Sequence, residues 1–206
     1  VMTSLRSCAR HRSAAGFSLV ELLLASSLGT VLCGLFVQLL LGDLRFTGAM
    51  AQRLQARRIQ QRTIALMRAE RELGHALVTD PPLSSTWPCN LAGRRPVLAL
   101  ALSANDPQAR QQAIVYTVGK PPSAIWRGEV LMRCGPAYGL DGQINLNSRF
   151  QNRVLLDGLP AGEGKGLLAL PHPQLPVVAI TLEQELPASG RADGSTAIHL
   201  SSRAAL

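Results

Sequence analysis

Apolar residues form one long run near the start of the chain. Residues 17–41 contain a single charged side chain, Glu21, and are otherwise apolar, small or uncharged. A helix of that length measures about 37 Å at ~1.5 Å per residue, which is enough to cross the roughly 30 Å hydrocarbon core of a bilayer. The pattern therefore predicts a transmembrane helix over residues 17–42, preceded by a basic leader peptide over residues 1–16.

An amphipathic pattern follows over residues 43–78, which contain no proline and many good helix formers. Ile59, Leu66 and Leu73 recur every seven residues, and the other faces carry charge. We therefore predict that the helix continues to residue 78, with this stripe as its apolar face.

The pattern changes again over residues 79–206, where short apolar segments alternate with turn residues. All 13 prolines lie beyond residue 80. Short connections between the segments favour antiparallel pairing of strands. We predict an α+β fold, in which a long N-terminal helix is followed by a small antiparallel β-sheet head. The strand candidates are Val97–Leu102, Ala113–Val118, Ile125–Arg133, Arg153–Leu156, Val177–Glu183 and Thr196–Ser201.

Charge modifies this picture in the helix more than in the head. The chain of 206 residues has a formal net charge of +8, and seven arginines fall within residues 43–78. Six of them could form a stripe that binds nucleic acid. Few aromatic residues accompany them, so a solvated or subunit-facing side of the helix is the simpler interpretation. These six are Arg53, Arg57, Arg58, Arg62, Arg68 and Arg71.

The junction of leader and apolar run carries the most specific motif of the chain. Residues 16–22 read GFSLVEL, with a glycine, then an aromatic residue, then a glutamate four residues later inside an apolar segment. This motif resembles the prepilin processing motif of type IV pilins and type II secretion pseudopilins. The resemblance implies that prepilin peptidase cleaves between Gly16 and Phe17 on the cytoplasmic face. It also implies that the same enzyme methylates the new amino group of Phe17.

The resemblance further implies a minor type IV pilin-like structural subunit. Such a subunit is a single-pass protein of the inner membrane with its head in the periplasm, and it then enters or primes a pilus used in adhesion, motility or DNA uptake. Its partners would be the lipid bilayer, other pilin or pseudopilin subunits and the inner-membrane assembly platform. The absence of proline before Pro81 favours a minor subunit. The alternatives are a minor pseudopilin of a type II secretion system and, more distantly, a membrane-anchored periplasmic binding protein or enzyme.

Glu21 has two interpretations. An ionisable residue inside a membrane segment is a functional candidate, and the resemblance implies an assembly ion pair with the Phe17 ammonium of the same or a neighbouring subunit. Glu21 also lies only about 6 Å along the helix from Phe17, so its side chain could reach the membrane surface instead. We expect the ion pair.

The remaining candidate chemistry is structural. If the head lies outside the cytoplasm, Cys89 and Cys134 are the only cysteines that could form a disulfide within it, and two free thiols are the alternative. The sequence has no zinc-ligand spacing, no P-loop and no paired nucleophile and base. We therefore expect no metal, no cofactor and no catalytic activity.

Overall fold

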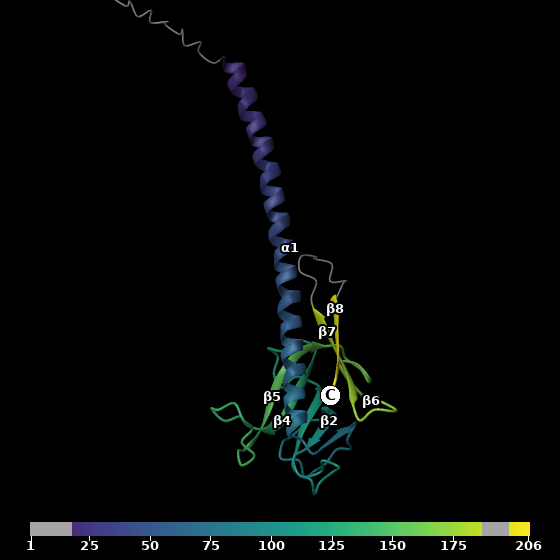
Figure 1. The fold of residues 1–206 in the computed structure, drawn as a ribbon. Coiled ribbons are helices and arrows are strands. Elements are labelled where there is room, and N and C mark those ends of the chain that lie inside the picture. The colour runs from purple at the N-terminus through teal and green to yellow at the C-terminus, as the bar shows by residue number, and fades with distance from the viewer. Residues whose placement is uncertain (1–17, 187–197) are drawn as a thin grey trace, which may run out of the picture. The chain divides into compact units, whose positions relative to one another are not determined.

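A computed structural model of the chain describes residues 18–186 and 198–206 (Figure 1). The predicted processing junction, Gly16 and Phe17, lies outside the described residues. The chain divides into two compact units, with the boundary between Thr47 and Gly48. One helix, α1 (Leu19–Leu73), contributes residues to both units.

The first part of α1 has the length and composition that the sequence predicted. Leu19–Gly42 is apolar over 24 residues, and its side chains are exposed in the isolated chain. An exposed apolar surface of this extent is unfavourable in water and favourable in hydrocarbon. This segment is therefore long and apolar enough to cross a membrane.

The C-terminal end of α1 corrects the predicted boundary. The helix ends at Leu73 rather than at residue 78, and Ala76–Thr79 forms strand β1, which pairs with β2. Gly74 follows the last helical residue, and glycine is a poor helix former. The segment after it gains a ladder of backbone hydrogen bonds along the sheet edge, so tertiary pairing decides its conformation.

The strands form two antiparallel sheets, and an α+β fold is observed as predicted. The first sheet has the order β1-β2-β3-β4-β5 and the second the order β6-β7-β8. The strands of the first sheet are β1 (Ala76–Thr79), β2 (Arg95–Ala101), β3 (Ala113–Gly119), β4 (Glu129–Pro136) and β5 (Phe150–Leu159). Those of the second are β6 (Leu167–Pro171), β7 (Val178–Leu186) and β8 (Ile198–Ala205).

All six strand candidates overlap an observed strand, and two strands were not predicted. One is β1, most of which the sequence analysis had assigned to the end of the helix. The other is β6, whose sequence LLALP is a short apolar run between glycine-rich and proline-rich turns. Only Leu167 and Ala169 of this strand are buried, but the outward positions are also apolar, Leu168 and Leu170, so the sequence shows no two-residue period.

Both faces of the first sheet are covered. Leu98 and Leu100 of β2 belong to the core that includes Ile64 and Met67 of α1 and residues of the second sheet. Ala99 and Ala101, which alternate with them, belong to a separate cluster under the loops around Trp87 and Ala109. The alternation follows from the two-residue period of a strand. The sheet is thus held between α1 on one face and loops on the other.

The buried face of α1 is not the stripe that the sequence predicted. Ile59 and Leu66 are half-buried at its margin, and Leu73 is 50% exposed. The buried face alternates apolar with polar side chains, so a search for apolar recurrence misplaces it. The residues buried on this face are Ala56, Gln60, Thr63, Ile64, Met67 and Glu70.

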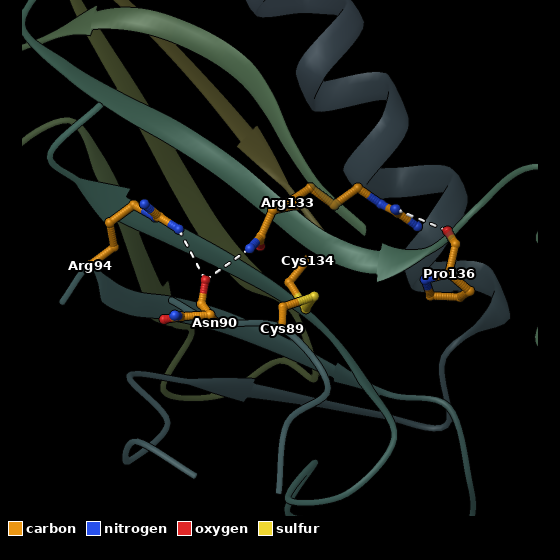
Figure 2. Close-up of a disulfide and its surroundings, with 7 residues drawn as sticks. Cys89, Asn90, Arg94, Arg133, Cys134 and Pro136 are labelled. Atoms are coloured by element: carbon orange, nitrogen blue, oxygen red, sulfur yellow. Dashed lines mark hydrogen bonds between the residues drawn. A yellow bond between two sulfur atoms is a disulfide. The ribbon is translucent and has the colours of Figure 1, made fainter. Parts of the chain in front are cut away.

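The predicted disulfide is present, and it fastens a loop to the sheet (Figure 2). It joins Cys89, in the loop that covers the outer face, to Cys134 of β4, with their Cα atoms 6.0 Å apart. Nearby, the indole Nε1 of Trp87 donates to the carbonyl of Ala109 at 2.7 Å. Loop residues thereby cover apolar side chains of β2 and β3 that would otherwise face water.

We expect loss of this disulfide to destabilise the head substantially. A cross-link that spans 45 residues restricts the unfolded chain by an amount equivalent to roughly 3–4 kcal/mol. The variant with Cys89→Ala and Cys134→Ala should therefore unfold at a lower urea concentration, and dithiothreitol should have no further effect on it. The matched control is Cys33→Ala, which removes the exposed cysteine of the apolar segment and should preserve the response to dithiothreitol. Complete alkylation of Cys89 and Cys134 in denatured, non-reduced protein would contradict the cross-link.

Candidate functional site

The described part of the processing motif forms the start of α1. The hydroxyl of Ser18 accepts a hydrogen bond from the Glu21 backbone N–H at 3.2 Å, and the Glu21 carboxylate accepts one from the Ser18 N–H at 3.0 Å. This reciprocal arrangement is a capping box, in which two side chains satisfy two free N–H groups at a helix start. Glu21 therefore has a local structural role that our sequence analysis missed, although the Ser-x-x-Glu spacing signals it. Whether it also pairs with the Phe17 amine stays a prediction.

Polar side chains further along the apolar segment are satisfied by the helix itself. Ser26 and Ser27 donate to the carbonyls of Leu23 and Leu24, both at 2.9 Å. Thr30 donates to the carbonyls of Ser26 and Ser27 at 3.1 and 2.8 Å. Hydroxyls bonded in this way present less unsatisfied polarity to a hydrocarbon environment. These side chains are thus compatible with a membrane-spanning helix.

A buried polar cluster fixes the other end of α1 to the sheet. Glu70 is fully buried, and its carboxylate accepts hydrogen bonds from Arg133 Nε at 2.6 Å, from Tyr138 Oη at 2.5 Å and from Tyr116 Oη. Arg133 lies on β4 and Tyr116 on β3, and Tyr138 lies in the segment after β4. We call these four residues the Glu70 clasp. Buried charges of this kind require a counter-charge and hydrogen bonds, and the clasp supplies both.

Arg133 occupies the centre of the clasp. Its Nη1 donates to the carbonyl of Pro136 at 3.1 Å (Figure 2), and its guanidinium lies 5.2 Å from the centroid of the Tyr138 ring. A Cβ atom at Gly135 would come within 2.9 Å of that guanidinium, so the glycine leaves room for the side chain to lie against its own strand. Sequence analysis placed Arg133 in a strand and gave Glu70 no role, because the two are far apart in the sequence.

The clasp also changes the titration of its two tyrosines. Burial raises the pKa of Tyr116 well above its usual value, and the negative charge of Glu70 raises it further. The pKa of Tyr138 is raised as well, first by burial and then by its hydrogen bond to Glu70. Both phenols therefore remain protonated in the folded head at a pH where an exposed tyrosine ionises.

We expect the stability of the head to fall as the pH rises above about 10, the usual tyrosine pKa. In that range the unfolded chain releases phenolic protons that the folded chain retains, so increasing pH favours unfolding. The stabilisation that the two protonated tyrosines contribute is fully present below about pH 10 and is lost as the pH approaches their raised pKa values. Urea midpoints between about pH 8 and pH 11 should fall more gently in the variant with Tyr116→Phe and Tyr138→Phe than in the unchanged chain. If the urea midpoint falls equally steeply with pH in both chains, the raised pKa values of Tyr116 and Tyr138 are contradicted.

Two of the six arginines in the predicted stripe form hydrogen bonds within the head. Arg68 Nε donates to the carbonyl of Ala205 at 3.3 Å, and Arg71 Nη1 to that of Gly74 at 3.2 Å. These two arginines thus attach α1 to its surroundings in the head. The other four have exposed side chains: Arg53, Arg57, Arg58 and Arg62. Nucleic-acid binding by these four stays a prediction.

Two histidines of the described residues make local contacts. His172 Nδ1 accepts hydrogen bonds from the backbone N–H groups of Gln174 and Leu175, both at 3.2 Å, and so stabilises a turn. His199 lies on β8 with its Nδ1 3.6 Å from a carboxylate oxygen of Glu185. Within residues 18–186 and 198–206, no three His, Cys, Asp or Glu residues are grouped so that they could hold a metal ion. The expectation that the chain is not an enzyme stays a prediction.

Comparison with known proteins adds no assignment to these features. No family model, no curated protein and no solved structure matches the chain.

Proposed function

We propose that this chain is a minor type IV pilin-like structural subunit. The observation that carries the proposal is the GFSLVEL motif, which lies between a basic leader and a segment long and apolar enough to cross a membrane. The proposal includes cleavage after Gly16, methylation of Phe17, retention in the inner membrane and later entry into a filament. Its partners are prepilin peptidase, other pilin or pseudopilin subunits and the assembly platform.

The rest of the structure is consistent with such a role. A subunit that leaves the bilayer for a filament needs a head that stays attached to its helix, and the Glu70 clasp makes that attachment through a buried ion pair. A head in the periplasm also lies in an oxidising compartment, where the bond between Cys89 and Cys134 is stable. The same features suit a minor pseudopilin of a secretion system, which is processed in the same way.

The test is the mature N-terminus of the chain made in a cell that contains a prepilin peptidase. We expect its intact mass to match a chain that begins at Phe17 and carries one added methyl group. Gly16→Val should leave the full-length precursor in the membrane, because a bulky side chain at the cleaved bond would not fit close to the protease.

The matched control is Gly34→Val, which makes the same substitution inside the apolar segment. No atom lies within 4 Å of a Cβ at Gly34 in the isolated chain, so the helix should accept the valine. This variant should mature normally. A mature N-terminus other than Phe17 in the unchanged chain, or normal maturation of Gly16→Val, would contradict the proposed function.

A further inference from the structure

A shallow groove opens on the outer side of the first sheet, next to the disulfide-linked loop. Its volume is about 810 Å³, and its walls come from that loop, from the β3–β4 connection and from strands β4 and β5. The basic side chains of Arg94 and Lys120 line it, whereas Arg153 pairs with Arg133 across β4 and β5 and so directs its side chain to the opposite, α1-facing side of the sheet. Among the described residues that line the groove, none is acidic. The groove therefore has a positive charge that its own walls do not compensate.

Arg94 is the unusual member of this group, because its side chain is only 5% exposed. Its Nη2 donates to the carbonyl of Asn90 at 3.3 Å (Figure 2), and its buried Nε has no hydrogen-bond partner among the described residues. No carboxylate of the described chain forms an ion pair with it. Burial lowers the pKa of Arg94, and no acidic neighbour offsets this effect. A buried charge without a counter-ion is costly unless a ligand supplies the opposite charge.

The backbone is shaped to hold Arg94 in this place. Gly119, at the end of β3, has a φ of +152°. A Cβ at Gly119 would come within 3.1 Å of Arg94 Cγ and 3.2 Å of its Cα. A bare glycine thus allows the arginine stem to lie against the strand end. The position of the unpaired guanidinium is therefore fixed by packing.

The groove also has an apolar side. Trp126 lines it together with the Pro121–Pro122 pair and Met132 of β4. Binding sites for small organic ligands commonly combine aromatic and apolar walls with a few charged groups that set the orientation. The basic residues and Trp126 thus suit a ligand that carries both an anionic group and a flat, weakly polar body.

We propose that this groove binds an oxyanion group, carboxylate or phosphate, carried by a sugar-sized ligand. Exposed Lys120 contacts the oxyanion, and the buried charge of Arg94 attracts it from the floor of the groove. Trp126 supports the body of the ligand. Such a site would allow the head to attach to an acidic or phosphorylated surface carbohydrate. The inference stands apart from the processing motif, so failure of one leaves the other intact.

The test is isothermal titration of the full chain in neutral detergent with glucose 6-phosphate, glucuronate, glucose and inorganic phosphate at one ionic strength. We expect the two charged sugars to bind at least about tenfold more tightly than glucose, as for loss of a charged hydrogen bond. The tighter of the two identifies the source of the oxyanion. Arg94→Met should weaken their binding about tenfold or more, and Lys120→Gln should weaken it several-fold. Trp126→Ala should weaken binding of the sugars but not that of inorganic phosphate.

The matched control is Arg203→Gln, which removes an exposed arginine from β8 of the second sheet. It should leave the affinities unchanged. Equal binding of glucose, absence of binding by every probe, or an equal loss in Arg203→Gln would overturn the proposal. If Arg94→Met does not fold, unchanged affinity in Lys120→Gln would overturn it as well.

Discussion

Glu70→Ala should lower the free energy of unfolding of the head by about 3–5 kcal/mol, the range measured when one partner of a buried ion pair is removed. The Arg133 side chain is only 5% exposed, so its charge would remain in the protein interior without a counter-ion. Tyr116, which is fully buried, would lose its acceptor at the same time. An effect of this size is a large fraction of the total stability of a typical domain.

The measurement is urea unfolding of the full chain in detergent, followed by the fluorescence of the buried Trp87. Glu72→Ala is the matched control, since Glu72 lies two residues further along the same helix and is exposed. The double variant Glu70→Leu with Arg133→Met should be more stable than Glu70→Ala, because neither charge is left unpaired. A midpoint for Glu70→Ala equal to that of Glu72→Ala would show that the clasp does not stabilise the head.

The clasp also explains which parts of the fold the sequence could predict. The apolar segment and the β-rich head follow from local patterns, namely apolar run length, proline placement and strand-like segments. The buried face of α1 does not, because Gln60, Thr63 and Glu70 are polar. Gln60 Nε2 donates to Gln184 Oε1 at 3.4 Å, and Gln60 Oε1 accepts a hydrogen bond from the Ser202 hydroxyl at 2.6 Å. Such residues are buried only because partners far away in the sequence meet them, so apolar recurrence selected the neighbouring stripe.

The same reason separates the predicted sites from the missed ones. The motif at Gly16 to Glu21 is local, and the pair Cys89 and Cys134 follows from a count of cysteines. The groove beside Arg94 requires the β3–β4 connection and β5 to meet the disulfide-linked loop, and the hydrogen bond from Asn152 to the Asn90 carbonyl at 2.8 Å joins two of these segments. No spacing in the sequence signals that meeting.

Substitutions at Glu21 should separate its two roles. The capping box accepts either Glu or Gln at this position, so Glu21→Gln keeps the helix cap and loses the charge. Ser18→Ala does the reverse, because it removes the hydroxyl that caps Glu21 N–H and leaves the carboxylate in place. Losing the Ser18 hydroxyl should cost about 1 kcal/mol of helix stability. Neither substitution changes Gly16 or Phe17, so both variants should be processed and inserted.

We expect Glu21→Gln to enter filaments at a ratio at least about tenfold below that of the unchanged chain, whereas Ser18→Ala enters nearly normally. If Glu21 pairs with the Phe17 ammonium during assembly, its neutral replacement leaves that ammonium unpaired among apolar helices, which costs several kcal/mol, and each ~1.4 kcal/mol changes an equilibrium about tenfold. The measurement is the amount of the subunit in sheared filaments divided by the amount in membranes. If Glu21→Gln assembles normally and Ser18→Ala does not, the carboxylate acts through the helix cap. If both assemble normally, neither the charge nor the cap is needed for assembly, and the assembly ion pair is wrong for this chain.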